Sequence, residues 1–379
     1  LMFLKELEEI VVREMNQCIG CNECMRVCPV SKSDDLTISQ LNDVIARGYP
    51  PKGIVREFTL NCVQCGRCVP VCPPGVRRDL MVLYSKYCLG SYPPKYDSYV
   101  RLKQPNPSTA AKAIYAIKKR TMKKALGSLY EKCDTEDLKE AELLFYPGCY
   151  VFNEVCHKTT AILEYLKEDY EVLAGYSTCC GWPQYLQGRL EMADEFMENL
   201  WNLIKKVNPK RIITSCAECY AALRKLKAWK QAEFIPLSTS EYFLMNKDRL
   251  PLVQFTDQKM AFHDSCHLSR KYHLDSAPRE LLSNLGAYQE VENHHDQTMC
   301  CYYYNFEYDQ QNKAHRQNRV NEVKKIGNIM ITDCITCYEV FKEKMNHQGF
   351  EVFEFNEMVF HCIQQEKLEI QKLEREGDN

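Results

Sequence analysis

The sequence predicts an α+β protein in which a helical, cysteine-rich N-terminal module precedes two duplicated α/β domains. Two matching cysteine runs near the N-terminus predict the first module. A longer series of cysteines that recurs at a fixed offset, among short apolar strands alternating with amphipathic helices, predicts the duplication. The expected divisions are 1–90 for the N-terminal module, 91–140 for a linker with a basic helix, 141–258 for the first repeat, and 259–379 for the second repeat with a charged C-terminal tail.

Composition and charge exclude several classes of protein. The chain has 379 residues, enough for several domains with their own cores, and a formal net charge of -2. A near-neutral balance argues against a nucleic-acid partner, which would require a basic face. No apolar run approaches the roughly 20 residues that span a bilayer, and the N-terminal segment lacks a signal-peptide pattern. We therefore expect a cytoplasmic protein without a transmembrane segment of its own, peripheral to a membrane only through a partner.

The 22 cysteines are the most informative feature of the composition. In a reducing cytosol they indicate metal binding rather than disulfides, and most of them occur in CxxC or CC groups. The sequence has no CxxCH for covalent haem and no Walker or GxGxxG pattern. Nucleotide or flavin binding is therefore expected in a partner.

The first two cysteine runs have the spacing of a ferredoxin that carries two cubane [4Fe-4S] clusters. Each run ends in Cys-Pro, and the fourth cysteine of such a run ligates the cluster of the other run. The predicted ligand sets are Cys18, Cys21, Cys24 and Cys72 for one cluster, and Cys62, Cys65, Cys68 and Cys28 for the other. Zinc held by CxxC pairs is the alternative, but two complete runs exceed what a four-thiolate zinc site requires. A helix is expected within 33–48, with Asp34 or Asp35 as its N-cap and Gly48 as its stop.

The remaining cysteines form a duplicated series. Their matching members lie 117, 121 and 118 residues apart, for the pairs Cys149 and Cys266, Cys179 and Cys300, and Cys216 and Cys334. The lone cysteine and the CxxC of each repeat follow predicted strands such as LLFY, RIIT and MITD, where open α/β sheets place their ligand-binding loops. The complete sets are Cys149, Cys179, Cys180, Cys216 and Cys219 in the first repeat, and Cys266, Cys300, Cys301, Cys334 and Cys337 in the second. Five cysteines exceed the need of a cubane or a zinc ion, and adjacent cysteines point apart in an extended segment, so a sharp turn or a cluster of unusual shape is implied.

The order Cys, CCG, CxxC in two copies, with FHDSCHLSRKYHLDSAPRELL at 262–282, resembles the heterodisulfide reductase catalytic subunit family, here fused to a ferredoxin module. In that family two cysteine-rich CCG domains hold two noncubane [4Fe-4S] clusters at a common cleft and cleave the disulfide of coenzymes M and B. The resemblance implies that each five-cysteine set holds one noncubane cluster and that the substrate is a disulfide or thiol. Zinc in place of the cluster in one CCG domain is the alternative.

The same architecture is similar to iron-sulfur subunits of glycolate and lactate oxidation, of anaerobic glycerol-3-phosphate dehydrogenase, and of the membrane complex linked to dissimilatory sulfite reduction. The resemblance therefore implies flavoprotein or membrane-bound redox subunits as partners. The alternative function is a non-catalytic electron relay for a flavoprotein dehydrogenase, an acyl-CoA-type reductase or a membrane quinone complex. No catalytic residue is assigned. The candidate region surrounds Cys149, Cys180, Cys266 and Cys301, with His267 as a candidate proton donor.

The second repeat departs from the pattern because Tyr302 stands where the first repeat has Gly181. Glycine permits a positive φ or a close backbone approach, and tyrosine makes both costly. Two interpretations stay open: the tyrosines at 302–304 narrow the cleft, or they pack as ordinary core. Four cysteines outside both series are expected to be buried apolar residues rather than ligands: Cys88, Cys133, Cys156 and Cys362.

Overall fold

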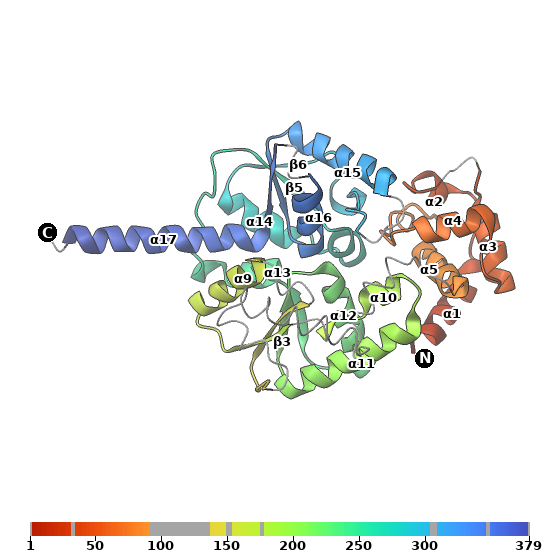
Figure 1. Cartoon of the computed structure of the whole chain (residues 1–379), viewed down its shortest axis with the longest axis horizontal. Coiled ribbons are helices and arrows are strands. Elements are labelled where there is room, and N and C mark those ends of the chain that lie inside the picture. Colours follow the sequence, from red (N-terminus) through yellow and green to blue (C-terminus); the bar gives the residue numbers. More distant parts are fainter. Residues whose placement is uncertain are drawn as a thin grey trace, which may run out of the picture.

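The computed structural model describes residues 2–31, 35–90, 137–148, 154–174, 178–303, 309–345 and 349–377. The predicted linker helix lies outside these residues, as do Cys133, Cys149 and Tyr304. Figure 1 shows three parts: a group of helices from the N-terminal region at one end, and two α/β units stacked beside it. The predicted α+β class is confirmed.

The N-terminal module is helical, and residues 2–31 and 35–90 form no strand. Its helices are α1 (Met2–Met15), α2 (Glu23–Arg26), α3 (Ile38–Arg47), α4 (Gly53–Asn61) and α5 (Arg78–Leu89). Helix α3 ends at Gly48, which has a φ of 62°, as predicted. The predicted start was wrong. The N-cap is Thr37, whose backbone N–H donates to Gln40 Oε1 at 2.7 Å in a capping box, rather than Asp34 or Asp35.

The first repeat contains a four-stranded parallel sheet in the order β2-β1-β3-β4. Its elements are β1 (Leu143–Gly148), α9 (Glu154–Tyr165), β2 (Tyr170–Ala174), α10 (Trp182–Leu186), α11 (Leu190–Val207), β3 (Arg211–Thr214), α12 (Ala217–Lys230), β4 (Ile235–Ser238), α13 (Thr239–Met245) and the 3-10 helix η2 (Lys247–Arg249). β1 and β3 lie at the centre of the sheet, and their buried apolar side chains explain the near-continuous hydrophobic runs LLFY and RIIT.

The second repeat contains an equivalent parallel sheet in the order β6-β5-β7-β8. Its elements are β5 (Met260–His263), the π-helix η3 (Cys266–Lys271), α14 (Ser276–Leu285), β6 (Tyr288–Glu290), the 3-10 helix η4 (His295–Gln297), α15 (Asp309–Lys324), β7 (Ile329–Thr332), α16 (Ile335–Met345), β8 (Glu351–Glu354) and α17 (Phe355–Gly377). The two sheets have the same strand order, with β1 matching β5 and β3 matching β7. The duplication inferred from the cysteine offsets is therefore a duplication of the fold.

The two repeats pack against each other through α17 of the second and α9 of the first. Asn356 Nδ2 donates to Thr159 Oγ1 at 2.8 Å and to Ser215 Oγ at 2.9 Å. Lys158 Nζ lies 2.5 Å from Glu357 Oε1. One apolar core contains side chains of both repeats, including Phe145 and Ile213 of the first and Phe262 and Phe355 of the second. Burial of this shared core holds the sheets together. Beyond it, α17 extends away from the rest of the chain (Figure 1).

The N-terminal module packs mainly on the first repeat, and Arg270 of the second repeat also contacts it. The backbone N–H of Met2 donates to Asp194 Oδ2 at 3.0 Å, and Lys225 of α12 pairs with Glu6 of α1. A second apolar core joins helices of this module to α10, α11 and α12. Among the described helices, none combines the length and apolar character that a membrane crossing requires.

Candidate metal centres

Thiols of the N-terminal module lie in two groups that mix the two sequence runs. Cys28 lines one small cavity together with the first three cysteines of the second run, and Cys24 reaches the same cavity. Burial raises the pKa of Cys28, and the nearby Cys62 and Cys65 raise it further. Burial also raises the pKa of Cys24. The charge of Arg78 is the next influence and lowers this pKa, whereas Cys72 and Cys18 raise it. The fourth cysteine of each run therefore lies beside thiols of the other run, as the Cys-Pro ending predicts.

Two buried cations support these thiol groups, and the sequence analysis did not identify either. Arg78, at the start of α5, donates to Cys18 Sγ at 3.2 Å and to Asn42 Oδ1 at 2.8 Å. Lys86, on the same helix, donates to the carbonyl oxygens of Cys62 at 2.6 Å and Leu186 at 3.2 Å, and burial lowers its pKa to about 8. Positive charge at buried thiols favours their thiolate forms, which bind iron. The arginines that follow the second Cys-Pro run, in VRRDL, were the sequence signal for Arg78.

In the first repeat, four of the five predicted cysteines are described and are buried together: Cys179, Cys180, Cys216 and Cys219. The fifth, Cys149, lies outside the described residues. Burial raises the pKa of Cys180, but hydrogen bonds from Cys179 and Cys219 outweigh that effect and lower it to about 6. These thiols follow β2 and β3 at the carboxyl ends of the parallel strands, the edge where ligands bind in open α/β sheets.

Two glycines bring the backbone close to this group. Gly181, with a φ of 76°, turns the chain after the cysteine pair, and a Cβ there would lie 2.8 Å from Phe196 Cβ. Gly148 ends β1 at a φ of 64°, and a Cβ there would lie 2.6 Å from Cys219 Sγ. Both positions combine the left-handed conformation with a close approach, so only glycine fits them without displacement. The sharp turn expected at the adjacent cysteines is present.

In the second repeat all five predicted cysteines are described and interact with one another. Cys266 begins the π-helix η3 after β5, and its pKa is raised most by a hydrogen bond with Cys300 and then by burial. Hydrogen bonds from Cys300 and Cys337 lower the pKa of Cys301 to about 6, against the effect of burial. The second member of the adjacent pair thus has a lowered pKa in both repeats, which is the electrostatic setting of a thiolate ligand.

Tyr302 occupies the position of Gly181 and keeps its backbone conformation. Its φ is 58°, and its backbone N–H lies 3.3 Å from Cys300 Sγ. The side chain is 2% exposed, and its ring stacks on His315 with centroids 4.6 Å apart. Cys65 and Cys28 of the N-terminal module are near enough to raise its pKa, after burial as the main cause. Tyr302 therefore adopts the positive φ that is costly for a tyrosine, and stacking and burial of its ring hold it there.

The CxxC loops of the two repeats face each other across the interface. Glu218 Oε2, inside the first CxxC, accepts hydrogen bonds from Cys216 Sγ at 3.1 Å and from Thr336 Oγ1 at 3.0 Å. Thr336 lies inside the second CxxC. The backbone N–H of Ile335 donates to the carbonyl oxygen of Ser215 at 2.9 Å. The two thiol groups therefore lie at a shared boundary, and Glu218 and Thr336 were not singled out by sequence reasoning.

His267, the candidate proton donor, lies next to Glu218 at this boundary. It is 3% exposed, and its Nδ1 is 3.8 Å from Glu218 Oε1. Burial, followed by the charges of Lys271 and Arg270, holds its pKa well below the usual range. The neutral imidazole is therefore favoured, which weighs against His267 as a proton donor. His263 is also buried and packs its ring 4.9 Å from Phe341.

Three cysteines outside both series are described, and two of them have the predicted burial. Cys156 and Cys362 are buried, and Cys362 Sγ donates to the carbonyl oxygen of Val253 at 3.4 Å. Cys88 is partly buried beside Tyr84. Cys133 lies outside the described residues.

Groups of buried thiols fit iron-sulfur clusters, because the irons of such clusters are held by soft cysteine thiolates. A helical dicluster module docked on two parallel sheets, with thiols at their carboxyl ends, defines an iron-sulfur electron-transfer protein.

Comparisons with known proteins agree with this class. The family model for the cysteine-rich domain, CCG, matches residues 143–224 and 260–342, and the model for the 4Fe-4S dicluster domain matches residues 10–73. The chain thus carries a 4Fe-4S dicluster domain followed by two cysteine-rich CCG domains.

Curated relatives include subunits of two reductases. A subunit of the fumarate reductase (CoM/CoB) of Methanothermobacter marburgensis is 28% identical over 159 residues, which are 41% of this chain and 32% of that protein. A subunit of the dihydromethanophenazine:CoB--CoM heterodisulfide reductase of Methanosarcina mazei is 24% identical over 164 residues, 40% of each chain. The lactate utilization protein A of Oceanobacillus iheyensis is 26% identical over 155 residues, 38% of this chain and 62% of that protein. The chain thus spans only part of these relatives.

Proposed function

We propose that the chain is an iron-sulfur oxidoreductase subunit of a larger complex with heterodisulfide-reductase-like disulfide and thiol chemistry. In this proposal the N-terminal module holds two cubane [4Fe-4S] clusters, and each CCG domain holds a noncubane [4Fe-4S] cluster. When bound, these clusters supply one-electron transfer, and a disulfide needs two electrons. Flavoprotein or membrane-bound redox subunits would be the partners.

The facing of the two CxxC loops is the observation that carries this proposal. Cys216 Sγ lies 3.8 Å from Thr336 Oγ1, so thiols of the two CCG domains border one interface. The second domain also reaches the dicluster module, because Arg270 Nη1 donates to the carbonyl oxygen of Cys65 at 2.5 Å. Together these contacts connect the dicluster module to the second domain and the second domain to the first, so electrons could pass from the dicluster module to thiols of both CCG domains.

The proposed ligands follow from the thiol groups. For the cubane clusters they are Cys18, Cys21, Cys24 and Cys72, and Cys62, Cys65, Cys68 and Cys28. For the CCG clusters they are Cys149, Cys179, Cys180, Cys216 and Cys219, and Cys266, Cys300, Cys301, Cys334 and Cys337. The lowered pKa values of Cys180 and Cys301 favour thiolates at equivalent places in both domains.

A non-catalytic relay is the second candidate, and Tyr302 favours it. Its buried ring lies between the second CCG thiols and the dicluster module. A substrate that contacted both groups of thiols would have to occupy the space that the ring fills. In this alternative the second CCG domain only transmits electrons and a partner performs the chemistry.

The test is an anaerobic purification followed by metal counting and spectroscopy. Four clusters require about 16 irons per chain, whereas about eight irons with one or two zincs would restrict the clusters to the dicluster module. A disulfide that alters the spectrum of the iron-loaded protein supports the disulfide chemistry. Full iron content with no response to any thiol or disulfide supports the relay instead.

A further inference from the structure

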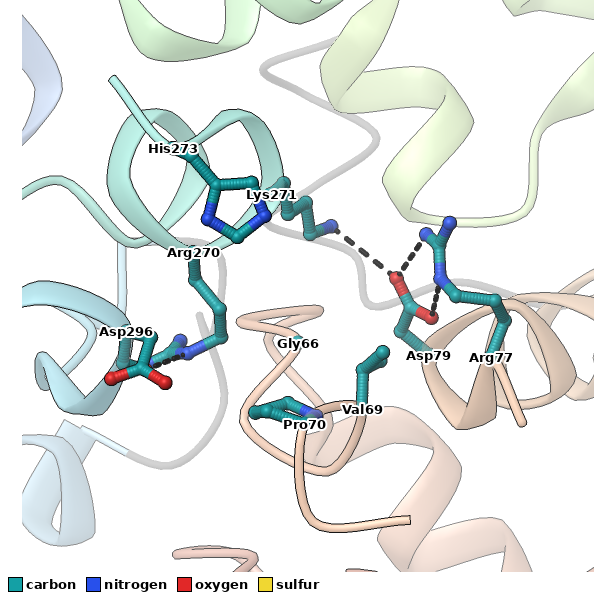
Figure 2. A pocket seen from close by; sticks show the side chains of 9 residues that line it. All are labelled: Gly66, Val69, Pro70, Arg77, Asp79, Arg270, Lys271, His273 and Asp296. Carbon is teal, nitrogen blue, oxygen red and sulfur yellow. Dashed lines mark hydrogen bonds and ion pairs between the residues drawn. The ribbon is translucent and has the colours of Figure 1, made fainter. Parts of the chain in front are cut away.

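A pocket of about 300 Å³ lies where the second cysteine run of the dicluster module meets the second CCG domain. Figure 2 shows its walls, which come from three separate regions of the chain. The lining residues are Gly66, Val69, Pro70, Arg77 and Asp79 of the module, and Arg270, Lys271, His273 and Asp296 of the CCG domain. Apart from the contact of Arg270 with Cys65, none of these side chains has a role in the function proposed above.

Asp79 is fully neutralised within this pocket. Arg77 holds it in a bidentate ion pair, with Nε 3.0 Å from Oδ1 and Nη2 2.9 Å from Oδ2. Lys271 Nζ approaches the same carboxylate only to 3.7 Å, beyond hydrogen-bond distance (Figure 2). Two cations therefore share one carboxylate, and the ammonium group of Lys271 retains donors for another acceptor.

Arg270 adds a further positive charge. Its guanidinium donates to the backbone carbonyl oxygens of Asp296 at 2.5 Å and Cys65 at 2.5 Å, and to that of Thr298. These bonds use three of its five N–H donors but leave its charge uncancelled, because carbonyl groups are neutral. With the carboxylates of Asp79 and Asp296 included, three arginine and lysine cations face two anions in the lining.

The remaining walls are suited to a small organic molecule. Val69 and Pro70 give an apolar surface next to the charged groups, and Figure 2 shows them below the side chain of Lys271. The volume is at the lower end of the range for small-molecule sites. We propose that this pocket binds a small organic anion, with a carboxylate, sulfonate or phosphate group on Lys271 and a short apolar body on Val69 and Pro70.

The pocket lies beside two chain segments that carry proposed cluster ligands. Gly66 directly follows Cys65, and Lys271 ends the π-helix that Cys266 begins. An anion bound here would lie between the dicluster module and the second CCG domain. An acidic side chain of a partner protein is the competing occupant. We favour the small molecule because Asp79 and Arg270, which set the charge of the pocket, are themselves buried and recessed from a partner's surface.

The experiment compares butyrate with butyramide, which have the same shape and differ in charge, on the anaerobically purified full chain. Ligand-observed NMR measures both affinities. We expect butyrate to bind at least about tenfold more tightly than butyramide and to lose that advantage at high ionic strength. Lys271→Gln should remove the advantage, and Lys271→Arg should keep it.

The matched control is Lys225→Gln, which removes another lysine that pairs with a carboxylate across a domain contact, here Glu6, outside the pocket. It should leave butyrate binding unchanged. Equal binding of butyrate and butyramide to the unaltered protein would overturn the proposal, as would tight butyrate binding by a folded Lys271→Gln variant. If Lys271→Gln does not fold, the ionic-strength dependence of the unaltered protein decides.

A second measurement tests whether an acidic peptide protects Lys271 from acetylation. Protection by the peptide, together with no binding of butyrate, would assign the pocket to a protein partner and reject the small anion. The outcome is independent of the proposed function. Iron counting tests the clusters, whereas this experiment tests the pocket, so full iron content without butyrate binding rejects the pocket proposal alone.

Discussion

The thiol of Cys216 lies 3.8 Å from the hydroxyl of Thr336, although 120 residues separate them in the chain. Both side chains are buried at the contact between the CCG domains, and Glu218 accepts a hydrogen bond from each. This small polar group is where the two halves of the duplication meet.

Thr336→Val tests the energetic value of that contact. Valine keeps the size of threonine but cannot donate to Glu218, and a buried hydrogen bond to a charged group contributes about 1.5 to 3 kcal/mol. We expect a loss of that order in the free energy of unfolding, measured by urea unfolding under anaerobic conditions.

Thr332→Val is the matched control for Thr336→Val. Within the described part of the chain, the buried hydroxyl of Thr332 at the end of β7 has no hydrogen-bond partner. Its removal should leave stability unchanged or raise it slightly. Equal losses in both variants would show that the Thr336 hydroxyl contributes nothing specific.

Gly181→Ala tests the turn that follows the first cysteine pair. The new Cβ would meet Phe196 Cβ at 2.8 Å and the carbonyl oxygen of Ala193 at 2.9 Å, at a φ of 76°. Overpacking would cost about 1 to 3 kcal/mol beyond the strain of the left-handed conformation. We expect lower stability and lower iron content. Gly75→Ala has the same strain, at a φ of 72°, but nothing within 4 Å of the new Cβ. It should lose only about 1 kcal/mol and keep its iron.

Tyr302→Gly tests whether the tyrosine closes the second CCG site. Glycine accepts the φ of 58° without strain but deletes the ring that stacks on His315. We expect an added small thiol to change the electron paramagnetic resonance spectrum of Tyr302→Gly and not that of the unaltered protein. Tyr302→Phe keeps the ring and should behave like the unaltered protein. A thiol response in all three proteins would mean that the site is open despite Tyr302.

Burial of the His315 imidazole should make the folded chain less stable in mild acid. Burial lowers the pKa of His315, and a hydrogen bond to the backbone of Pro29, which can only accept, partly opposes that shift. The folded chain therefore disfavours the protonated imidazole. Its contribution to stability is full above the unfolded pKa of about 6.5 and is lost as the pH falls below it.

His315→Gln should flatten this dependence. Between pH values of about 7.5 and 5.5, we expect the unaltered protein to lose more stability than the variant, measured as the shift in urea midpoint. His263 and His267, whose pKa values are also lowered by burial, leave a residual slope in both proteins. An identical slope in both would exclude His315 as a contributor.

The local patterns of the sequence predicted the fold class and most of the thiol groups. Cysteine spacing, the constant offset between repeats and the apolar strands LLFY, RIIT and MITD depend on neighbours in the chain, so they can be read without coordinates. The N-cap of α3 was misassigned because Asp34, Asp35 and Thr37 are all competent caps, and the pairing of Thr37 with Gln40 decides between them.

The sequence by itself determined the kind of fold and, among the described thiols that interact, which ones lie together. Only the tertiary structure decided how those groups are arranged: Thr336 against Cys216, Arg78 against Cys18, and Lys271 above Asp79. The three contacts join residues that are 120, 60 and 192 positions apart in the chain, the last being 271 − 79. Such pairings depend on how the helices and sheets pack, and packing uses the shape and charge of both partners, which no local pattern contains.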